Sequence, residues 1–216
     1  AQLLEMVEDQ PLDDWGFRDA RTVHYMVEAE RRAYADRAEW LGDPDFWDVP
    51  TEELREAAYA RSRMENFDPE RATPSESIRH GEPILDPTET THYSLVDPEG
   101  NAVSITTTLN SGYGSAVWVQ GAGFLLNNEM DDFSAKPGAP NQAGLLGNEA
   151  NAIAPGKRML SSMTPTIVER GGELYCVVGT PGGSTIITSV FQMILNINDF
   201  GMTAREAVAQ PRFHHQ

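Results

Sequence analysis

The sequence predicts an α+β protein in which strands pack against helices on both outer sides. Apolar residues at 23–41 recur at three- and four-residue steps, which indicates an amphipathic helix. From Thr91 onward the apolar period changes to two, as in half-buried strands, before a nearly all-apolar run at 185–201. The density of acidic residues falls at the same place, since residues 1–89 hold 23 of the 33 Asp and Glu residues. We therefore expect a helical unit at 1–89 and a strand-rich unit at 90–216.

The helical unit begins with RTVHYMVEAERRAYADRAEWL, residues 21–41, which predicts a long helix with charges opposite its apolar stripe. The sequence LGDPDF ends this helix, and a second one is expected at 52–63 with Thr51 as its cap and a mostly exposed surface. Prolines follow at positions 69, 74, 83 and 87. Because proline has no backbone N–H, it interrupts the hydrogen bonds of both helices and sheets. These prolines predict an exposed, extended connector up to residue 89.

The strand-rich unit contains two predicted hairpins. THYSLVD (91–97) and AVSITTTLN (102–110) flank the turn sequence DPEGN, and TPTIVER (164–170) and ELYCVVG (173–179) flank a Gly-Gly pair. The run TIITSVFQMILNINDFG (185–201) is apolar nearly all the way round, which predicts a helix buried between layers. Thr203 and Glu206 have the spacing of a capping box and predict a last short helix.

Composition excludes several classes of function. The formal net charge of −17, without a cluster of Lys and Arg, argues against nucleic-acid binding. The longest apolar stretch, 186–197, is shorter than the ~20 residues that a bilayer span needs, so no membrane segment is expected. The opening AQLLEMVEDQ lacks the features of a signal peptide. A single cysteine, Cys176, forms no internal disulfide and is expected to be a buried structural thiol.

Thr90 is the first candidate for chemistry. Threonine is a poor nucleophile until a base takes its proton, and its own α-amino group can do this once the residue is N-terminal. That requires cleavage after Glu89, at the end of the predicted connector. The ordinary alternative is that a threonine pair simply opens a strand. Across the first hairpin, Thr108 and its neighbouring hydroxyls could line the face that Thr90 shares.

The sequence GTPGGS, residues 179–184, is a candidate anion cradle. Gly182 and Gly183 can present consecutive backbone N–H groups at the start of the buried helix, as in an oxyanion hole. The alternative is a tight strand-to-helix turn that needs glycine. The sequence lacks the Gly-Lys-Ser/Thr ending of a phosphate loop.

Two polar stretches could hold the ends of an amino acid. Glu129, Asp131 and Asp132 in NNEMDDF either face solvent or bind a cation, and the neighbourhood lacks the further ligands that a metal needs. Ser161 and Ser162 either form a loop-to-strand junction or hold a carboxylate. Together with the preceding candidates they describe a site for an α-amino acid whose side-chain acyl group is attacked, with no metal or other cofactor.

The motifs TTHYS, TLN, NNEMDDF, FSAKPG, KRMLSSMTPTI, GTPGGS and PRFHH, in this order, resemble the γ-glutamyltransferase family. The upstream EAERRAYADRAEWLGDPDF is similar to the end of that family's large subunit. The resemblance implies an N-terminal nucleophile hydrolase with a four-layer αββα sandwich, incomplete in this fragment. It also implies a precursor that cuts itself into two subunits, with residues 1–89 from the large subunit and 90–216 from the small one.

The resemblance further implies a reaction. Thr90 attacks the carbonyl of Glu89, becomes the new N-terminus, and then attacks the γ-amide of glutathione or another γ-glutamyl compound. Water, an amino acid or a peptide accepts the γ-glutamyl group. Bacterial members are commonly periplasmic or secreted, so an exported location is expected.

Roles for the remaining residues follow from the same resemblance. Thr108 orients Thr90, and Gly182 and Gly183 supply the oxyanion donors. Asn110, Glu129 and Asp132 bind the donor's α-amino group, and Ser161 and Ser162 help to bind its α-carboxylate. The family also pairs this carboxylate with an arginine from the first half of the large subunit, which lies outside this sequence. We therefore expect little turnover from the 216-residue chain alone.

Two alternative functions remain open, and one loop differs from the family's usual sequence. An acylase of the same superfamily that releases a glutaryl-type chain from a β-lactam nucleus is the first alternative, but its donor lacks the amino group that Glu129 and Asp132 would bind. An unprocessed, non-catalytic relative is the second. The loop at 137–148 offers Ala143 where many bacterial relatives have an aromatic gate, which predicts a more open donor pocket.

Overall fold

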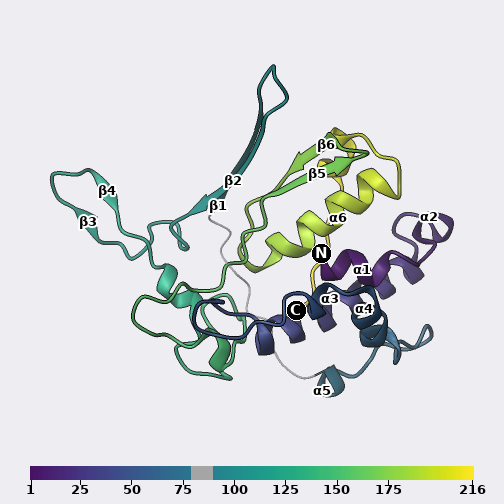
Figure 1. Cartoon of the computed structure of the whole chain (residues 1–216), viewed down its shortest axis with the longest axis horizontal. Coiled ribbons are helices and arrows are strands. Elements are labelled where there is room, and N and C mark those ends of the chain that lie inside the picture. The colour runs from purple at the N-terminus through teal and green to yellow at the C-terminus, as the bar shows by residue number, and fades with distance from the viewer. Residues whose placement is uncertain (79–89) are drawn as a thin grey trace.

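The computed structural model describes residues 1–78 and 90–216 and contains helices together with antiparallel two-stranded ladders (Figure 1). The helices are α1 (Gln2–Val7), α2 (Leu12–Trp15), α3 (Ala20–Trp40), α4 (Ala57–Met64), α5 (Ser75–Ile78), α6 (Ile186–Asn198) and α7 (Ala204–Ala209). The strands are β1 (Thr90–Val96), β2 (Ala102–Thr108), β3 (Trp118–Val119), β4 (Phe124–Leu125), β5 (Thr166–Arg170) and β6 (Glu173–Val178). Short 3₁₀ turns lie at Glu53–Arg55, Glu129–Asp132, Glu149–Asn151 and Gly183–Thr185. The predicted α+β class is confirmed.

The main core joins the two halves of the sequence. Helices α1, α3 and α4 contribute Met6, Met26 and Met64, and α6 contributes Phe191 and Leu195 to the same buried cluster. Figure 1 shows α6 between the β5/β6 hairpin and these helices. The second half therefore folds directly onto α3, as burial of an all-round apolar helix requires.

Much of the charged face of α3 is buried, which its apolar stripe alone does not reveal. Six charged side chains on this helix are buried: Glu28, Glu30, Arg31, Arg32, Asp36 and Arg37. They are satisfied by partners distant in sequence, which local periodicity does not reveal. The C-terminal tail provides one of these partners, because the backbone N–H of His215 donates to Glu30 Oε2 at 3.0 Å.

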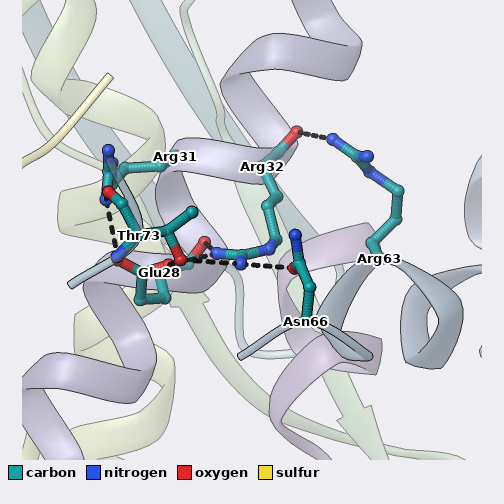
Figure 2. Close-up of polar contacts among 6 residues, drawn as sticks. All are labelled: Glu28, Arg31, Arg32, Arg63, Asn66 and Thr73. Carbon is teal, nitrogen blue, oxygen red and sulfur yellow. Dashed lines mark hydrogen bonds and ion pairs between the residues drawn. The ribbon is translucent and has the colours of Figure 1, made fainter. Parts of the chain in front are cut away.

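A network around Glu28 holds the start of the connector on α3 (Figure 2). Glu28 accepts hydrogen bonds from Arg31 at 2.7 Å and from the hydroxyl of Thr73 at 2.6 Å. Arg31 also donates to the carbonyl of Thr73 at 2.8 Å, and Arg32 donates to Asn66 Oδ1 at 2.7 Å. Buried charges are tolerated when they are paired and hydrogen-bonded in this way. The predicted exposed connector is thus bound at residue 73, and its part at 79–89, with Pro83, Pro87 and Glu89, lies outside the described residues.

The second predicted helix, at 52–63, is divided in two. Glu56 has an extended backbone conformation, with φ −70° and ψ 132°, between the 3₁₀ turn at 53–55 and α4. Thr51 is not its cap, since its hydroxyl donates to the carbonyl of Val49 at 3.4 Å. Leu54 on the first piece and Ala60 on the second are both buried. Most of the other residues at 52–63 are exposed, so the predicted surface position of this element is confirmed.

Both predicted hairpins are confirmed. In the first, Thr90 pairs with Thr108 at the open end, and Asp97 Oδ1 accepts from the backbone N–H of Asn101 at 2.7 Å in the turn. Gly100 has a φ of +88° there, which glycine adopts without strain. In the second, β5 and β6 are joined by the Gly-Gly turn, and the register shifts near Val168.

The two hairpins contact each other through two serine side chains. Ser94 Oγ donates to the carbonyl of Val177 at 3.3 Å, and Ser104 Oγ donates to the carbonyl of Val178 at 3.2 Å. Strand β6 in turn packs on α6, where Val178 joins a cluster with Ile186. The resulting order of layers is β1/β2, β5/β6, α6 and α3. None of the helices in the described residues is long and apolar enough to cross a membrane. Cys176 on β6 is half-buried, so it is less enclosed than predicted.

Candidate active site

The hydroxyls of Thr90 and Thr108 meet at the open end of the first hairpin. Thr90 begins β1, Thr108 ends β2, and Thr90 Oγ1 donates to Thr108 Oγ1 at 3.3 Å. The backbone N–H of Asn110 donates to the same Thr108 oxygen at 3.0 Å. Asn110 has a φ of +75°, which turns the chain sharply after β2. The strand register therefore places a second hydroxyl where it can orient the first.

The acidic 3₁₀ turn, Glu129–Asp132, forms the negative side of the site. Asn110 Nδ2 donates to the carbonyl of Asn128 at 3.3 Å and so ties this turn to the end of β2. Glu129 Oε1 is buried, and no described residue donates a hydrogen bond to it. Burial raises the pKa of Glu129 to about 7, and the nearby Asp132 carboxylate acts in the same direction. A ligand ammonium would relieve both effects. Asp131 instead accepts from the backbone N–H of Gln142 at 2.9 Å.

Ser161 and Ser162 also line the site, and each hydroxyl oxygen accepts a hydrogen bond from the protein. Ser161 Oγ accepts from the backbone N–H of Met163 at 3.0 Å. Ser162 Oγ accepts from Arg37 Nη2 at 3.1 Å. With their oxygens engaged in this way, the hydroxyl protons of both serines are left to donate to a ligand acceptor.

The glycine turn before α6 has the conformation that only glycine adopts readily. Gly182 and Gly183 have φ values of +143° and +55°, and Gly183 begins the 3₁₀ turn that runs into α6. Tyr34 of α3 holds this turn from behind, since its hydroxyl donates to the carbonyl of Ser184 at 2.6 Å. The unpaired N–H groups at a helix start attract negative charge.

These groups surround one pocket with an empty volume of about 360 Å³, its open mouth included. Its lining residues are Thr90, Thr108, Asn110, Glu129, Asp132, Ala143, Leu145, Ser161, Ser162, Met163, Gly183, Ser184 and Ile186. The structure thus brings together the candidate residues of five separate segments. Gly182 adjoins the lining residue Gly183, Asp131 is not in the lining, and Glu89 lies outside the described residues.

Comparisons with known proteins identify the family to which the chain belongs. The family model described as Gamma-glutamyltranspeptidase matches residues 1–216. The chain belongs to the γ-glutamyltranspeptidase family. A "Glutathione hydrolase proenzyme" of Pseudomonas aeruginosa is 54% identical over 100% of this chain and 39% of its own length. The chain thus spans about two fifths of that relative.

Solved structures of the γ-glutamyltranspeptidase family and of acylases are also similar. A point mutant of the Helicobacter pylori gamma-glutamyltranspeptidase aligns with a TM-score of 0.57 and 61% identity, covering 58% of this chain and 68% of its own. A cephalosporin acylase from Bacillus halodurans aligns with a TM-score of 0.71 and 27% identity, covering 98% of this chain and 36% of its own. The predicted N-terminal nucleophile hydrolase fold is confirmed by these likenesses.

In this member of the γ-glutamyltranspeptidase family, sequence reasoning missed two residues of α3. Tyr34 and Arg37 lie one helical turn apart and reach the glycine turn and Ser162, respectively. One feature of the sequence could have pointed to them. Arg37 follows Tyr34 by three residues and so lies on the apolar stripe of the helix, where a charged residue is unexpected. Ala143 does line the pocket, and a more open donor site remains a hypothesis.

Proposed function

We propose that this chain carries the nucleophile and the donor site of an enzyme that hydrolyses or transfers the γ-glutamyl group of glutathione and related compounds. One observation carries the proposal: the paired hydroxyls of Thr90 and Thr108 share a pocket with an acidic pair and a serine pair. An α-amino acid offers an ammonium to the acids and a carboxylate to the serines. Its side-chain carbonyl then extends toward Thr90.

The first reaction in this proposal is cleavage of the chain. The Thr90 hydroxyl attacks the carbonyl carbon of Glu89, the C–N bond breaks, and the hydroxyl proton passes to the nitrogen that leaves. The products are an ester on Thr90 Oγ1 and a free α-amino group on the same residue. Water hydrolyses this ester, which restores the hydroxyl and gives Glu89 a carboxylate. Residues 1–89 and 90–216 then belong to two subunits of one precursor.

The second reaction uses the same hydroxyl on a γ-glutamyl donor. The α-amino group of Thr90 takes the hydroxyl proton, Oγ1 attacks the γ-carbonyl, and the departing amine takes a proton as its bond breaks. Thr108 Oγ1, 3.3 Å from the nucleophile, keeps it oriented. Backbone donors of Gly182 and Gly183 stabilise the oxyanion. Water, an amino acid or a peptide amine then attacks the γ-glutamyl ester and restores Thr90.

The pair of acids separates this proposal from an acylase reaction. A glutaryl donor has no ammonium, so it would leave the buried Glu129 Oε1 without a partner and next to the Asp132 charge. Buried polar groups without partners weaken binding. The likeness to a cephalosporin acylase and the small Ala143 in the pocket wall make the acylase the second candidate.

Mass spectrometry and one pair of substrates test the proposal. The full-length gene product should split between Glu89 and Thr90, and Thr90→Ala should stay intact. The cleaved protein should release p-nitroaniline from γ-glutamyl-p-nitroanilide at least tenfold faster than from glutaryl-p-nitroanilide, given the cost of an unpaired ammonium site. A wild-type chain that stays intact, or a preference for the glutaryl compound, would refute it. The proposal includes an exported location, which cell fractionation tests.

A further inference from the structure

Arg37 is a buried cation directly behind the wall of the candidate donor pocket. Only 9% of the residue is exposed, and its guanidinium Nη2 lies 3.1 Å from Ser162 Oγ. It is not among the residues that line the pocket, whereas Ser162 is. Arg37 and Asp132 also line a second, smaller hollow next to it. Any effect of Arg37 on a ligand must therefore pass through a neighbouring side chain or through its charge.

The surroundings of Arg37 keep its charge in place. A buried guanidinium stays protonated in proteins and needs compensation. Burial lowers the pKa of Arg37, while Tyr34 and the Asp132 carboxylate oppose that change. Arg37 also lies in the last turn of α3, where the carbonyl end of the helix favours a cation. A positive group is thus fixed behind Ser162, and it is near enough to the Asp132 carboxylate to interact with it.

The hydrogen bond from Arg37 fixes the direction in which the Ser162 hydroxyl can donate its proton. A guanidinium has only donors, so Ser162 Oγ must be the acceptor in this pair. The one proton of the hydroxyl is then directed away from Arg37. Ser161 is arranged in the same way by the backbone N–H of Met163. Without Arg37, the Ser162 hydroxyl could rotate and present its lone pairs to the pocket, which a carboxylate ligand would not tolerate.

We infer that Arg37 is a positioning residue for donor selection, which fixes Ser162 as a hydrogen-bond donor and places positive charge behind it, so that the pocket requires an α-carboxylate. This inference rests on the proposed γ-glutamyl activity and extends it. The pocket then offers the carboxylates of Glu129 and Asp132 to the ammonium and the hydroxyls of Ser161 and Ser162 to the carboxylate, which matches an amino-acid zwitterion. The selection comes from a helix before the cleavage site, although the nucleophile and both serines follow it.

The test compares ligands with and without the α-carboxylate in the full-length gene product. In Arg37→Met, the KM for γ-glutamyl-p-nitroanilide should rise about tenfold or more, the scale of a lost hydrogen bond to a charged group. The kcat should change by less than about threefold, because the reacting atoms are untouched. The inhibition constant of 4-aminobutyramide, which keeps the amine but lacks the carboxylate, should stay within about twofold. Arg21→Met, an exposed arginine on the same helix, is the matched control and should change none of these values.

Ser162→Ala should raise the KM in the same way, and the double variant should be no worse than the poorer single variant within about twofold. Arg37→Lys retains the charge and should recover part of the loss. If Arg37→Met does not fold, Ser162→Ala and Arg37→Lys carry the same comparison. An unchanged KM, a parallel loss for 4-aminobutyramide, or additive losses in the double variant would overturn the inference. A wild-type protein that hydrolyses no γ-glutamyl donor would instead overturn the proposed function.

Discussion

The raised pKa of Glu129 should determine how binding of the γ-glutamyl donor depends on pH. With a pKa of about 7, roughly one tenth of this carboxyl is ionised at pH 6 and roughly nine tenths at pH 8. A donor ammonium binds the ionised form, so kcat/KM should rise about tenfold over this interval for that reason alone. Glu129→Gln has the same shape and no titration, so it should lack this rise.

The assay is hydrolysis of γ-glutamyl-p-nitroanilide at subsaturating concentration between pH 5.5 and 8.5, about the range over which this group titrates. The α-amino group that the proposed cleavage creates on Thr90 is common to both proteins. The ratio of wild-type to Glu129→Gln kcat/KM therefore isolates the carboxyl. Asp131→Asn, which alters an acid held by the backbone of Gln142, serves as the control and should keep the wild-type profile. A ratio that stays constant with pH would refute the reasoning.

The same pKa has a consequence for stability. The folded protein holds the Glu129 proton more tightly than the unfolded chain, since its pKa is raised from 4.5 to about 7. The resulting stabilisation is complete below pH 4.5 and is lost as the pH rises through 7. Without ligand, Glu129→Gln should therefore unfold at a higher temperature than the wild type above pH 7, and at a similar temperature near pH 4.5.

Three further substitutions test the scaffold of the site. Gly182→Ala would put a Cβ 2.7 Å from Thr185 Oγ1 at a φ of +143°, so chain cleavage and hydrolysis should both fall at least a hundredfold by gel and rate assays. Tyr34→Phe removes the hydrogen bond to the carbonyl of Ser184, so the free energy of unfolding should fall by about 0.5–1.5 kcal/mol and kcat should fall more than KM rises. Thr203→Ala removes the cap of α7 and should cost about 1 kcal/mol in urea unfolding, with kcat unchanged.

Features encoded by neighbouring residues could be predicted from the sequence. The first hairpin follows from alternation on both sides of DPEGN, and its register then brings Thr90 opposite Thr108 without further information. The second follows in the same way from Gly171 and Gly172. The capping box at Thr203 is likewise local. Loop residues such as Glu129 were assigned to the site from the family resemblance. Their position could not be predicted from periodicity, because no periodic pattern determines where a loop folds back.

Features that depend on distant partners could not be predicted. Glu28 and Glu30 look like solvent-facing residues of an amphipathic helix. Arg31 and Arg32 pair with Glu28 from within the helix, but Thr73 and the tail at His215, which are distant in sequence, complete the hydrogen bonds that make the burial of the two acids tolerable. Arg37 is buried for the same kind of reason, through a serine more than one hundred residues away. The break at Glu56 also reflects the core beneath it, since the local residues are compatible with a continuous helix.

Under the proposed self-cleavage, the pairing of the first and last residues of the β1/β2 hairpin would make correct folding a condition for maturation. Thr90 meets Thr108 only when all seven cross-strand pairs are in register, and a slip by one position would turn Thr90 to the opposite face. Under the proposed chemistry, a misfolded chain cannot cut itself and so cannot expose an active amine. Cleavage would then act as a quality-control checkpoint that requires no chaperone or protease, and the fraction of cut chains would report directly on folding yield.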